Sequence, residues 1–518
     1  MEIDSTLTNV KEIDMLHLIK EFNFIIACDS YKLNHWKELP EGTTRSYAAI
    51  VPRKPSKYAT RIVAMGQTYV ANFLSAVRIT QAMIEEAEIE AHQQGYEFNR
   101  EDWEIIVNEL DGKLPLEVWA VEEGRIIDPQ TPLLGIVNTD DRFAWLPTYV
   151  ETVVQCTVWK MSTVASTCRA ARITIEKYMK MTGSNMDMLN YKLHNFGDRG
   201  ADSPDEAAVI AGIAHAAVFS GSDCTRANGY IKKLFNTDKV YTSSVEATEH
   251  SVMCANSDTE KRDDFGAAQM AVCRLHAVVA RTKRGIGIPL LSVVIDTFNA
   301  RRFVYEYMGT LFKKEIEESG GVMVMRPDSG DANVEPALVA RDLEATFGAT
   351  KNAKGYKVLA PCVRIIQGDG IRINTIEGVL KGFTDAGYSM DNLTLGMGAG
   401  VTHEGARDDF SFSMKAIAMA DENGWRELVK EPITDLGKKS LRGLVRPFEQ
   451  ADGSLKVINC TNNPEDFFID SPGWRLWSKD GVRVRFQSFD EVQECARTKV
   501  STASKGWSDK VIENFTEA

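Results

Sequence analysis

The stretch Val322-Met323-Val324-Met325-Arg326-Pro327-Asp328-Ser329-Gly330 runs from an apolar segment directly into a polar turn. The same pattern recurs at 363–370, Val-Arg-Ile-Ile-Gln-Gly-Asp-Gly, and at 393–400, Leu-Thr-Leu-Gly-Met-Gly-Ala-Gly. Parallel α/β sheets present ligand-binding groups in this way, because an apolar strand ends in an acidic or glycine-rich turn that leads into a helix. We therefore expect a site for phosphate and sugar groups at these three strand ends.

The region around these segments repeats one rhythm, from about residue 185 to 405. A short apolar or β-branched run is followed by a polar turn and then by a stretch with helical periodicity, which predicts βα units. The apolar runs end near Phe196, Ser220, Ser244, Asp296, Arg326, Gln367 and Gly396. That number of strands is close to what a closed parallel barrel needs, so the pattern favours an α/β fold with an irregular TIM-like barrel over an open sheet.

The two flanks of this region are predicted to form a single α+β domain built from both ends of the chain. Residues 21–160 mix strand and helix patterns, and the C-terminal part predicts a hairpin of 474–477 and 482–486 around Lys479-Asp480-Gly481. We therefore expect residues 1–184 and 409–518 to share the α+β domain and residues 185–408 to form the barrel.

The amino-acid composition limits the kinds of function that this protein can have. The 518 residues are 44% hydrophobic and 26% charged, which describes a globular chain long enough for two or three domains. A net charge of -13 argues against nucleic acid as a partner. The nine cysteines contain no C-x-x-C pair and fit a reducing compartment. Residues 1–20 do not resemble an export signal, and no apolar run approaches the roughly 18 residues of a membrane span. We expect a cytoplasmic protein without a membrane partner.

Three further segments place polar side chains after predicted strands. They are Lys192-Leu193-His194-Asn195-Phe196-Gly197-Asp198-Arg199-Gly200, Phe219-Ser220-Gly221-Ser222-Asp223 and Thr248-Glu249-His250-Ser251. If each follows a successive strand, an aromatic ring, a guanidinium, a carboxylate and an imidazole converge at one rim of the sheet.

Together with Asp29-Ser30-Tyr31-Lys32, these segments resemble the nicotinamide phosphoribosyltransferases, of the type II phosphoribosyltransferase family. The matching blocks occur in the family's order from about Phe22 to Phe489, nearly the whole chain. The resemblance implies a pentosyltransferase of NAD salvage, which transfers phosphoribosyl from 5-phosphoribosyl-1-pyrophosphate to nicotinamide and yields nicotinamide mononucleotide and pyrophosphate. Nicotinate phosphoribosyltransferase, with the same fold and reaction type, is the alternative.

The resemblance also assigns the pyridine site. It implies that the ring stacks between Phe196 and Tyr31 of the partner subunit, so the enzyme would be a homodimer with active sites at the interface. The positions that match amide-binding residues are Arg199, Asp223 and Ser292. An ionised Asp223 can only accept hydrogen bonds, which suits a carboxamide NH2 and repels the carboxylate of nicotinic acid.

For the sugar donor, the resemblance implies a set of catalytic, ribose-binding and phosphate-binding positions. They are Arg326, Asp328, Gly368, Asp369, Gly398, Ala399, Gly400, Arg407, Lys415, Lys430, Lys438 and Arg53 of the partner subunit. Asp328 and Asp369 suit ribose hydroxyls and the positive charge that grows on C1. Mg2+ would complete charge neutralisation on the leaving pyrophosphate.

His250 matches the histidine that this family phosphorylates with ATP as a coupled co-substrate. A carboxylate that orients the second ring nitrogen would help the imidazole to act as the nucleophile. Glu249 and Asp296 are the two candidates for that role by position alone.

Taken singly, each of these residues has an ordinary structural explanation. The Gly-x-Gly turn is commonly just a turn, Asp328 and Asp369 can be helix N-caps, and His250 can be a structural histidine. Their ordered co-occurrence favours the site. Three positions depart from the family pattern, namely Ala399 where glycine is usual, Asp198 where an aromatic residue is usual and Glu246 where proline is usual. A catalytically silent binding protein is the remaining alternative. In such a protein we would expect the catalytic positions to have been replaced.

Overall fold

A curled parallel sheet of seven strands forms one half of the computed structural model, which describes residues 22–434 and 439–498. In spatial order the strands are β7 (Gly221–Ser222), β6 (Leu193–Asn195), β14 (Leu393–Met397), β13 (Val363–Gln367), β10 (Val322–Arg326), β9 (Leu290–Val294) and β8 (Glu246–Ala247). A parallel bridge between Gly221 and Ser243 brings the chain just before β8 alongside β7, the opposite edge. Strands end at or near the predicted positions Phe196, Asp296, Arg326, Gln367 and Gly396, and the α/β class is confirmed. Near Ser220 and Ser244 the prediction was shifted, because the residues up to Val218 are helical and the short strands β7 and β8 begin only at Gly221 and Glu246.

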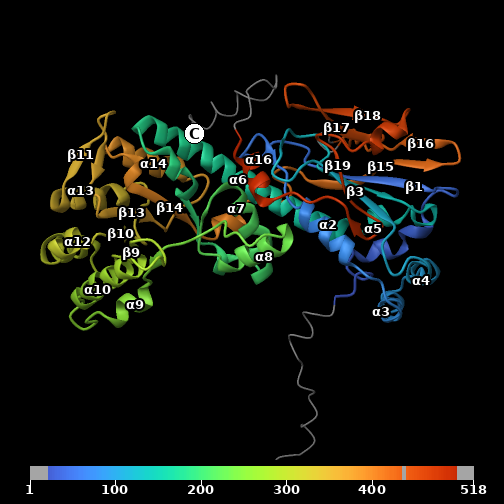
Figure 1. Ribbon diagram of the computed structural model, residues 1–518. Coiled ribbons are helices and arrows are strands. Elements are labelled where there is room, and N and C mark those ends of the chain that lie inside the picture. Colours follow the sequence, from blue (N-terminus) through green and yellow to red (C-terminus); the bar gives the residue numbers. More distant parts are fainter. Residues whose placement is uncertain (1–21, 435–438, 499–518) are drawn as a thin grey trace, which may run out of the picture.

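Helices cover the outer face of this sheet (Figure 1). The helices of this half are α7 (Ile213–Val218), α8 (Thr225–Phe235), α9 (His250–Ala255), α10 (Phe265–Thr282), α11 (Ala300–Arg302), α12 (Lys313–Glu318), α13 (Glu335–Phe347), α14 (Ile376–Asp385) and α15 (Gly400–His403), with the shorter or π-helical turns η4 (Met186–Tyr191), η5 (Asp198–Gly200), η6 (Glu206–Gly212), η7 (Phe303–Leu311) and η8 (Met390–Asn392). The strands explain this covering, because alternate apolar residues such as Met323 and Met325 point outward into a buried cluster.

The N-terminal and C-terminal parts of the chain share a second, antiparallel sheet of seven strands. Its order is β16 (Gly424–Glu427), β15 (Ser413–Asp421), β1 (Arg45–Val51), β5 (Leu134–Asn138), β3 (Leu116–Ala120), β19 (Arg475–Lys479) and β20 (Val482–Arg483). In Figure 1 its blue and cyan strands lie beside orange and red ones. The predicted hairpin is present, with Asp480 and Gly481 at φ of 49° and 68°, as a two-residue turn of type I′ requires.

Smaller elements complete this half. They are the strand pairs β2 (Ile62–Val63) with β4 (Ile126–Ile127) and β17 (Val445–Glu449) with β18 (Leu455–Asn459), the helices α2 (Gln67–Ala76), α3 (Gln81–Gln93), α4 (Arg100–Glu109), α5 (Leu146–Tyr149) and α16 (Phe489–Arg497), and the turns η2 (Ser30–Lys37), η3 (Asp141–Phe143) and η10 (Pro464–Phe468). The pair β11 (Ala349–Lys351) and β12 (Lys357–Leu359) lies on the other half, between α13 and β13.

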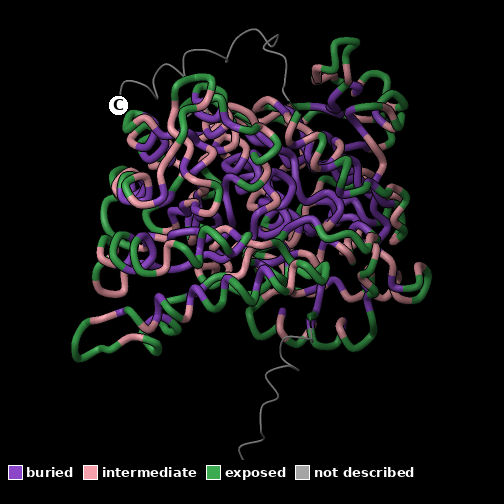
Figure 2. Tube along the Cα trace, turned by 60° about the vertical axis from the view of Figure 1, so that its left-hand side comes forward, coloured by how far each residue is buried: buried purple, intermediate pink, exposed green. Residues whose placement is uncertain are grey.

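The helix α6 (Glu151–Thr182) joins two separate buried clusters. Val154 and Val158 near its start pack with the antiparallel sheet, whereas Met161 and Met179 belong to the cluster around the parallel sheet. Figure 2 shows the buried segments concentrated in the interior of the molecule, with exposed segments around them. Helix α16 also packs into the parallel-sheet cluster, through Phe489. The domain boundaries at 184/185 and 408/409 stay predictions. In the described parts of the chain, no helix is both long enough and apolar enough to cross a bilayer.

Candidate active site

The turns after neighbouring parallel strands meet at one rim of the curled sheet. Strands β6, β14, β13, β10 and β9 are consecutive neighbours, so the polar turns that follow them are neighbours too. The turns also bond to one another, since the N–H of Phe196 donates to the carbonyl of Met397 at 2.8 Å. The predicted alignment of these turns along one rim is therefore present.

Phe196 lies at the centre of this rim, and two glycines make room for its ring. A β-carbon on Gly396 would collide with the ring edge. A β-carbon on Gly368 would lie 3.5 Å from the ring, 3.2 Å from Oδ1 of Asp328 and 3.7 Å from Cδ of Arg326. Four residues predicted for the site from three different strand ends thus surround one point. The ring is half-buried, so one part of its surface remains open.

Asp296, just after β9, connects His250 with the turn after β10. Its Oδ1 lies 3.3 Å from Nε2 of His250, and its Oδ2 accepts hydrogen bonds from the N–H of Asp328 at 3.2 Å and from the hydroxyl of Ser329. Nδ1 of His250 lies 3.7 Å from Oδ2 of Asp328. Of the two predicted candidates, Asp296 is therefore the carboxylate that contacts the imidazole. Glu249 is the N-cap residue of α9, and within the described residues no hydrogen bond or ion pair joins its side chain to His250.

The residues predicted to bind the amide come from three strands. Arg199 lies in η5 after β6 and is exposed, and Asp223 is exposed in the turn after β7. The N–H of Asp223 donates to the carbonyl of Asn195 at 3.0 Å, which joins its turn to the end of β6. Ser292 is only 3% exposed within β9. Its neighbours Leu291 and Val293 belong to the buried cluster, and the Ser292 side chain points to the opposite face of β9 from theirs.

The turn after β14 tolerates its alanine. Ala399 has φ of -54° and ψ of -18°, an ordinary right-handed conformation in which a methyl group causes no strain. The backbone conformation at this position is therefore compatible with alanine. The turn packs tightly against the one after β6, since a β-carbon on Gly197 would lie 2.7 Å from the carbonyl oxygen of Gly398. Asp369 is exposed after β13, where Nε2 of Gln367 donates to its carbonyl at 2.9 Å.

Three of the predicted basic residues lie on the antiparallel sheet or just beyond its strands: Lys415 on β15, Arg53 after β1 and Lys430 after β16. Lys415 on β15 pairs with Ala49 of β1. Burial lowers the pKa of Lys415, and the nearby charges of Lys430, Arg53 and Lys32 lower this pKa further. The guanidinium of Arg53 donates to the carbonyl and hydroxyl of Ser411, both at 2.9 Å. These contacts place Arg53, Lys415 and Lys430 in one group, which we call the basic cluster.

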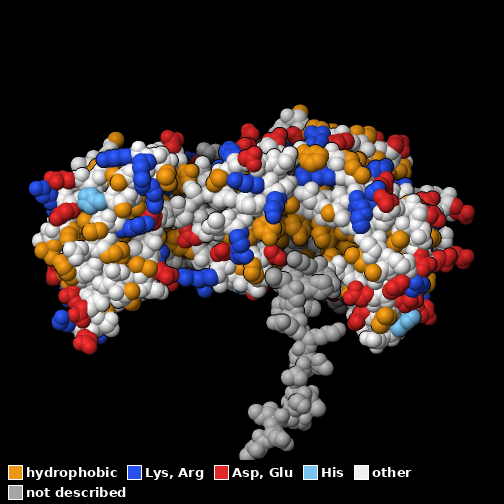
Figure 3. All heavy atoms as spheres, turned by 60° about the horizontal axis from the view of Figure 1, so that its bottom comes forward, with side chains coloured by type: hydrophobic (Ala, Val, Ile, Leu, Met, Phe, Trp, Pro, Cys, Tyr) orange, Lys and Arg blue, Asp and Glu red, His pale blue; other side chains and the backbone are white. Residues whose placement is uncertain are grey.

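Tyr31 belongs to the same half of the molecule as the basic cluster. It lies in η2, is 54% exposed, and its hydroxyl donates to Oδ2 of Asp29 at 3.2 Å. Arg407 follows α15 and is exposed beside Asp408, with an N–O distance of 3.2 Å. Lys438 lies outside the described residues. Figure 3 shows one face of the molecule, on which Lys and Arg side chains are interspersed with Asp and Glu.

Sequence reasoning missed several polar residues that act between the turns. Ser329 donates to Asp296 and could have been suspected from its place beside Asp328. Nε2 of His403 contacts the carbonyl of Gly200, and no local pattern indicates this. Glu246, one of the unusual positions, pairs with Arg274 and with Arg281 at 2.6 Å, so its charge is balanced.

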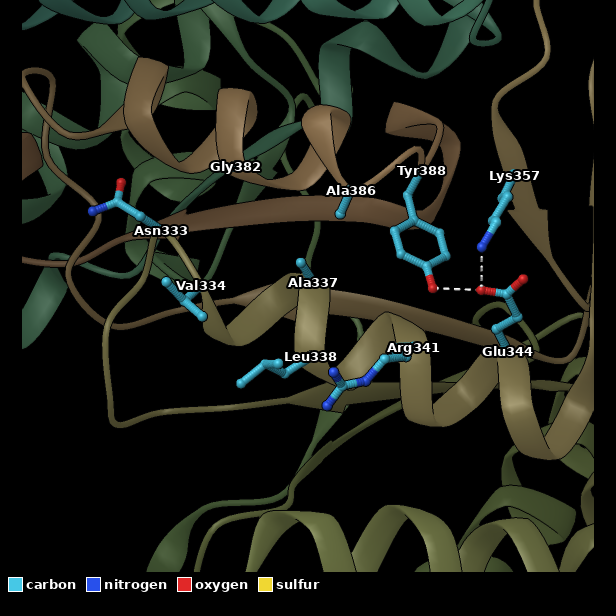
Figure 4. A pocket seen from close by; sticks show the side chains of 10 residues that line it. All are labelled: Asn333, Val334, Ala337, Leu338, Arg341, Glu344, Lys357, Gly382, Ala386 and Tyr388. Carbon is cyan, nitrogen blue, oxygen red and sulfur yellow. Dashed lines mark hydrogen bonds and ion pairs between the residues drawn. The ribbon is translucent and has the colours of Figure 1, made fainter.

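A cavity of about 420 Å³ lies elsewhere, on the outer face between α13 and α14 (Figure 4). The polar side chains at one end of the cavity bond to one another. Glu344 accepts hydrogen bonds from Lys357 at 2.7 Å and from the hydroxyl of Tyr388 at 2.6 Å. None of the residues predicted for the active site lines it. The candidate site at the strand ends and this cavity are therefore in different places.

Comparisons with known proteins agree with this arrangement. The model of the nicotinate phosphoribosyltransferase (NAPRTase) family matches residues 191–464, and that of the nicotinamide phosphoribosyltransferase N-terminal domain matches residues 23–118. The chain is similar to two proteins named nicotinamide phosphoribosyltransferase. The one from Xanthomonas campestris pv. campestris is 34% identical over 81% of this chain and 86% of the relative. The one from Acinetobacter baylyi is 30% identical over 83% and 89%.

Two solved structures share the fold. Nicotinate-nucleotide pyrophosphorylase from Pyrococcus furiosus superposes with a TM-score of 0.56 at 14% identity, covering 90% of this chain and 93% of that one. Human nicotinic acid phosphoribosyltransferase gives a TM-score of 0.51 at 15% identity, covering 90% and 92%. Because the first family model spans more than half of the chain and the bacterial relatives cover most of it, the chain belongs to the family of nicotinate and nicotinamide phosphoribosyltransferases.

Proposed function

We propose that the protein is a nicotinamide phosphoribosyltransferase of NAD salvage. The pyridine nitrogen of nicotinamide attacks C1 of 5-phosphoribosyl-1-pyrophosphate, the bond from C1 to the pyrophosphate oxygen breaks, and nicotinamide mononucleotide and pyrophosphate leave. The observation that carries this proposal is the meeting of Phe196, Arg326 and Asp328 around Gly368. An aromatic face for the ring, and a cation and a carboxylate for the donor, are the groups that this transfer needs.

Asp223 favours nicotinamide over nicotinate as the acceptor. Its carboxylate is exposed at the rim, where it can accept a hydrogen bond from a carboxamide NH2. A carboxylate substrate at the same place would bring two negative charges together. The Xanthomonas and Acinetobacter relatives are both named for nicotinamide, which supports the same choice.

His250 is the proposed acceptor of the ATP γ-phosphoryl group. With Asp296 as hydrogen-bond acceptor at 3.3 Å, the imidazole proton is assigned to Nε2 and the lone pair to Nδ1. Nδ1 attacks the γ-phosphorus, the bond to the bridging oxygen breaks, and ADP leaves. Asp328 lies 3.7 Å from Nδ1, so a phosphoryl group there would be close to the donor-binding turn. This proximity would couple ATP hydrolysis to donor binding.

Mg2+ fits the carboxylates at the rim. Mg2+ is commonly bound by one or two carboxylates together with substrate phosphates, and Asp328 and Asp369 follow adjacent strands. Within the described residues no cluster of three metal-ligating side chains occurs, so the substrate oxygens would supply the rest of the shell. When bound, the ion would neutralise charge on the pyrophosphate.

The proposed active unit is a homodimer. Tyr31 and the basic cluster lie on the antiparallel sheet, and we propose that the partner subunit supplies these residues to the rim of this one. The curled sheet would then be an irregular TIM-like barrel, with the flanks as the α+β domain. Because the nine cysteines fit a reducing compartment, we propose that the protein is located in the cytoplasm.

One assay tests the proposal. Purified protein is supplied with 5-phosphoribosyl-1-pyrophosphate and Mg2+, with nicotinamide or nicotinic acid in parallel, each with and without ATP. We expect nicotinamide mononucleotide as the main product and a higher yield with ATP. A preference for nicotinic acid would establish the alternative enzyme, and no product from either would favour a silent scaffold.

A further inference from the structure

Asp198 bridges the two turns that carry the pyridine-binding residues. It lies in η5, between Phe196 and Arg199, after strand β6. Its Oδ1 accepts from Nη2 of Arg226 at 3.1 Å and from Sγ of Cys224 at 3.4 Å. Cys224 directly follows Asp223 in the turn after β7. One carboxylate oxygen therefore joins the turn of Arg199 to the turn of Asp223.

The surroundings of Cys224 make this bridge a defined contact. Cys224 is fully buried against Ala208 and Ala227, and it is the N-cap residue of α8. Burial raises the pKa of its thiol to about 11, so the thiol keeps its proton, which Asp198 accepts in competition with the carbonyl of Ala207, 3.5 Å from Sγ. The N–H of Cys224 also donates to Oγ of Ser222 at 3.1 Å. The sulfur is thus held in place, and Asp198 is positioned against it.

Charge favours the same arrangement. A carboxylate close to the first turn of α8 interacts favourably with the helix dipole, whereas Arg226 in that turn is unfavourable unless it is paired. The Asp198 side chain is 33% exposed and that of Arg226 is 46% exposed, so solvent weakens the ion pair. Such a pair contributes little to global stability. Its effect is local, on the spacing between the two turns.

We propose that Asp198 is a positioning residue for the acceptor ring, which fixes the distance between Arg199 and Asp223 by fastening their turns together. This inference rests on the proposed function, because it takes these two residues as the groups that bind the carboxamide. Asp198 itself does not touch the substrate. Its removal should weaken acceptor binding and leave the donor site, which lies on β10, β13 and β14, little changed.

The test compares Asp198→Ala, Asp198→Asn and Arg226→Met with the parent protein. Lys313→Met is the matched control, because Lys313 forms a pair of similar exposure with Glu317 on α12. We expect the KM for nicotinamide to rise about fivefold in Asp198→Ala and in Arg226→Met, with the KM for 5-phosphoribosyl-1-pyrophosphate within about twofold. Asp198→Asn keeps an acceptor oxygen and should recover part of the loss. The double variant should be no worse than Asp198→Ala, since both changes remove one interaction.

A second readout does not depend on activity. The rate of Cys224 alkylation by iodoacetamide, followed by peptide mass spectrometry, should rise about fivefold or more in Asp198→Ala and stay at the parent value in Lys313→Met. An unchanged labelling rate, an unchanged nicotinamide KM, or an equal rise in both KM values overturns the inference. A parent protein that forms no nucleotide overturns the proposed function, and with it the assignment of these turns to the acceptor. The labelling rates then still test the contact between Asp198 and Cys224.

Discussion

One carboxylate oxygen of Asp296 lies 3.3 Å from Nε2 of His250, and the other accepts from the N–H of Asp328. A single side chain thus joins the imidazole to the turn predicted to bind the donor. In the proposed mechanism, movement of His250 on phosphorylation would be transmitted through Asp296 to that turn. The contact would then give a physical route for the proposed coupling between the two sites.

Replacing His250 with Ala should abolish ATP stimulation and leave basal nucleotide formation measurable. Asp296→Asn should slow phosphorylation by about 10², because the amide can no longer hold the imidazole proton as a carboxylate does. The measurement is transfer of label from γ-³²P-ATP to protein, together with nucleotide yield with and without ATP. Glu249→Gln is the control and should behave as the parent. Full stimulation in His250→Ala would exclude the phosphohistidine.

Gly396→Ala should distort the acceptor platform, because its methyl group would meet the ring of Phe196. We expect the free energy of unfolding to fall by about 1–3 kcal/mol and the KM for nicotinamide to rise. Urea unfolding and steady-state kinetics measure the two effects. Gly229→Ala is the matched control, since Gly229 lies inside α8 with open space around it. That change should stabilise the protein by roughly 0.5–1 kcal/mol.

Asp223→Asn should erode the discrimination between the amide and the acid. A neutral side chain removes the repulsion of nicotinate and weakens the hydrogen bond to nicotinamide. The ratio of kcat/KM for the two substrates should fall by about 10- to 100-fold. Parallel assays with both substrates measure the ratio. A ratio equal to that of the parent would remove Asp223 from the specificity site.

Acid should destabilise the fold through two buried histidines. Burial lowers the pKa of His215 to about 3, and burial also lowers the pKa of His194, although Asp223 opposes this. The unfolded chain binds these protons near pH 6.5, whereas the folded chain does not. The free energy of unfolding should therefore fall as pH decreases from about 6.5 to 5, by at most about 1.4 kcal/mol per pH unit for each histidine.

The pH dependence of urea unfolding tests this. His215→Leu removes one of the two groups and should flatten the slope by about one proton. The exposed His276, changed to Gln, is the control and should leave the slope as it is. Equal slopes in all three proteins would show that His215 does not carry the effect.

Much of the candidate site could be predicted because its residues follow short, strongly patterned strands. Asp328 lies two residues beyond the end of β10 and Gly368 directly follows β13, and the parallel pairing of these two strands makes the two residues neighbours. The choice between Glu249 and Asp296 could not be made from sequence. Glu249 is adjacent to His250 along the chain, but contact with the ring depends on where β9 ends.

Other features depend on long-range geometry that no local pattern records. The partners of Asp198 lie 26 and 28 residues away along the chain. The effect of Ala399 depended on the sign of one dihedral angle, and φ proved to be negative. The basic cluster was predicted as phosphate-binding residues, yet its position on the antiparallel sheet follows from the pairing of β15 with β1.

Helix α6 packs its first turns into one buried cluster and its remaining turns into the other. Its 32 residues span about 48 Å, and each added residue turns the helix by about 100°. An insertion between Val158 and Met161 would rotate one contact face out of phase with the other. The rotation of this helix about its axis therefore links the orientations of the two sheets. Insertions or deletions between the two clusters should accordingly be poorly tolerated.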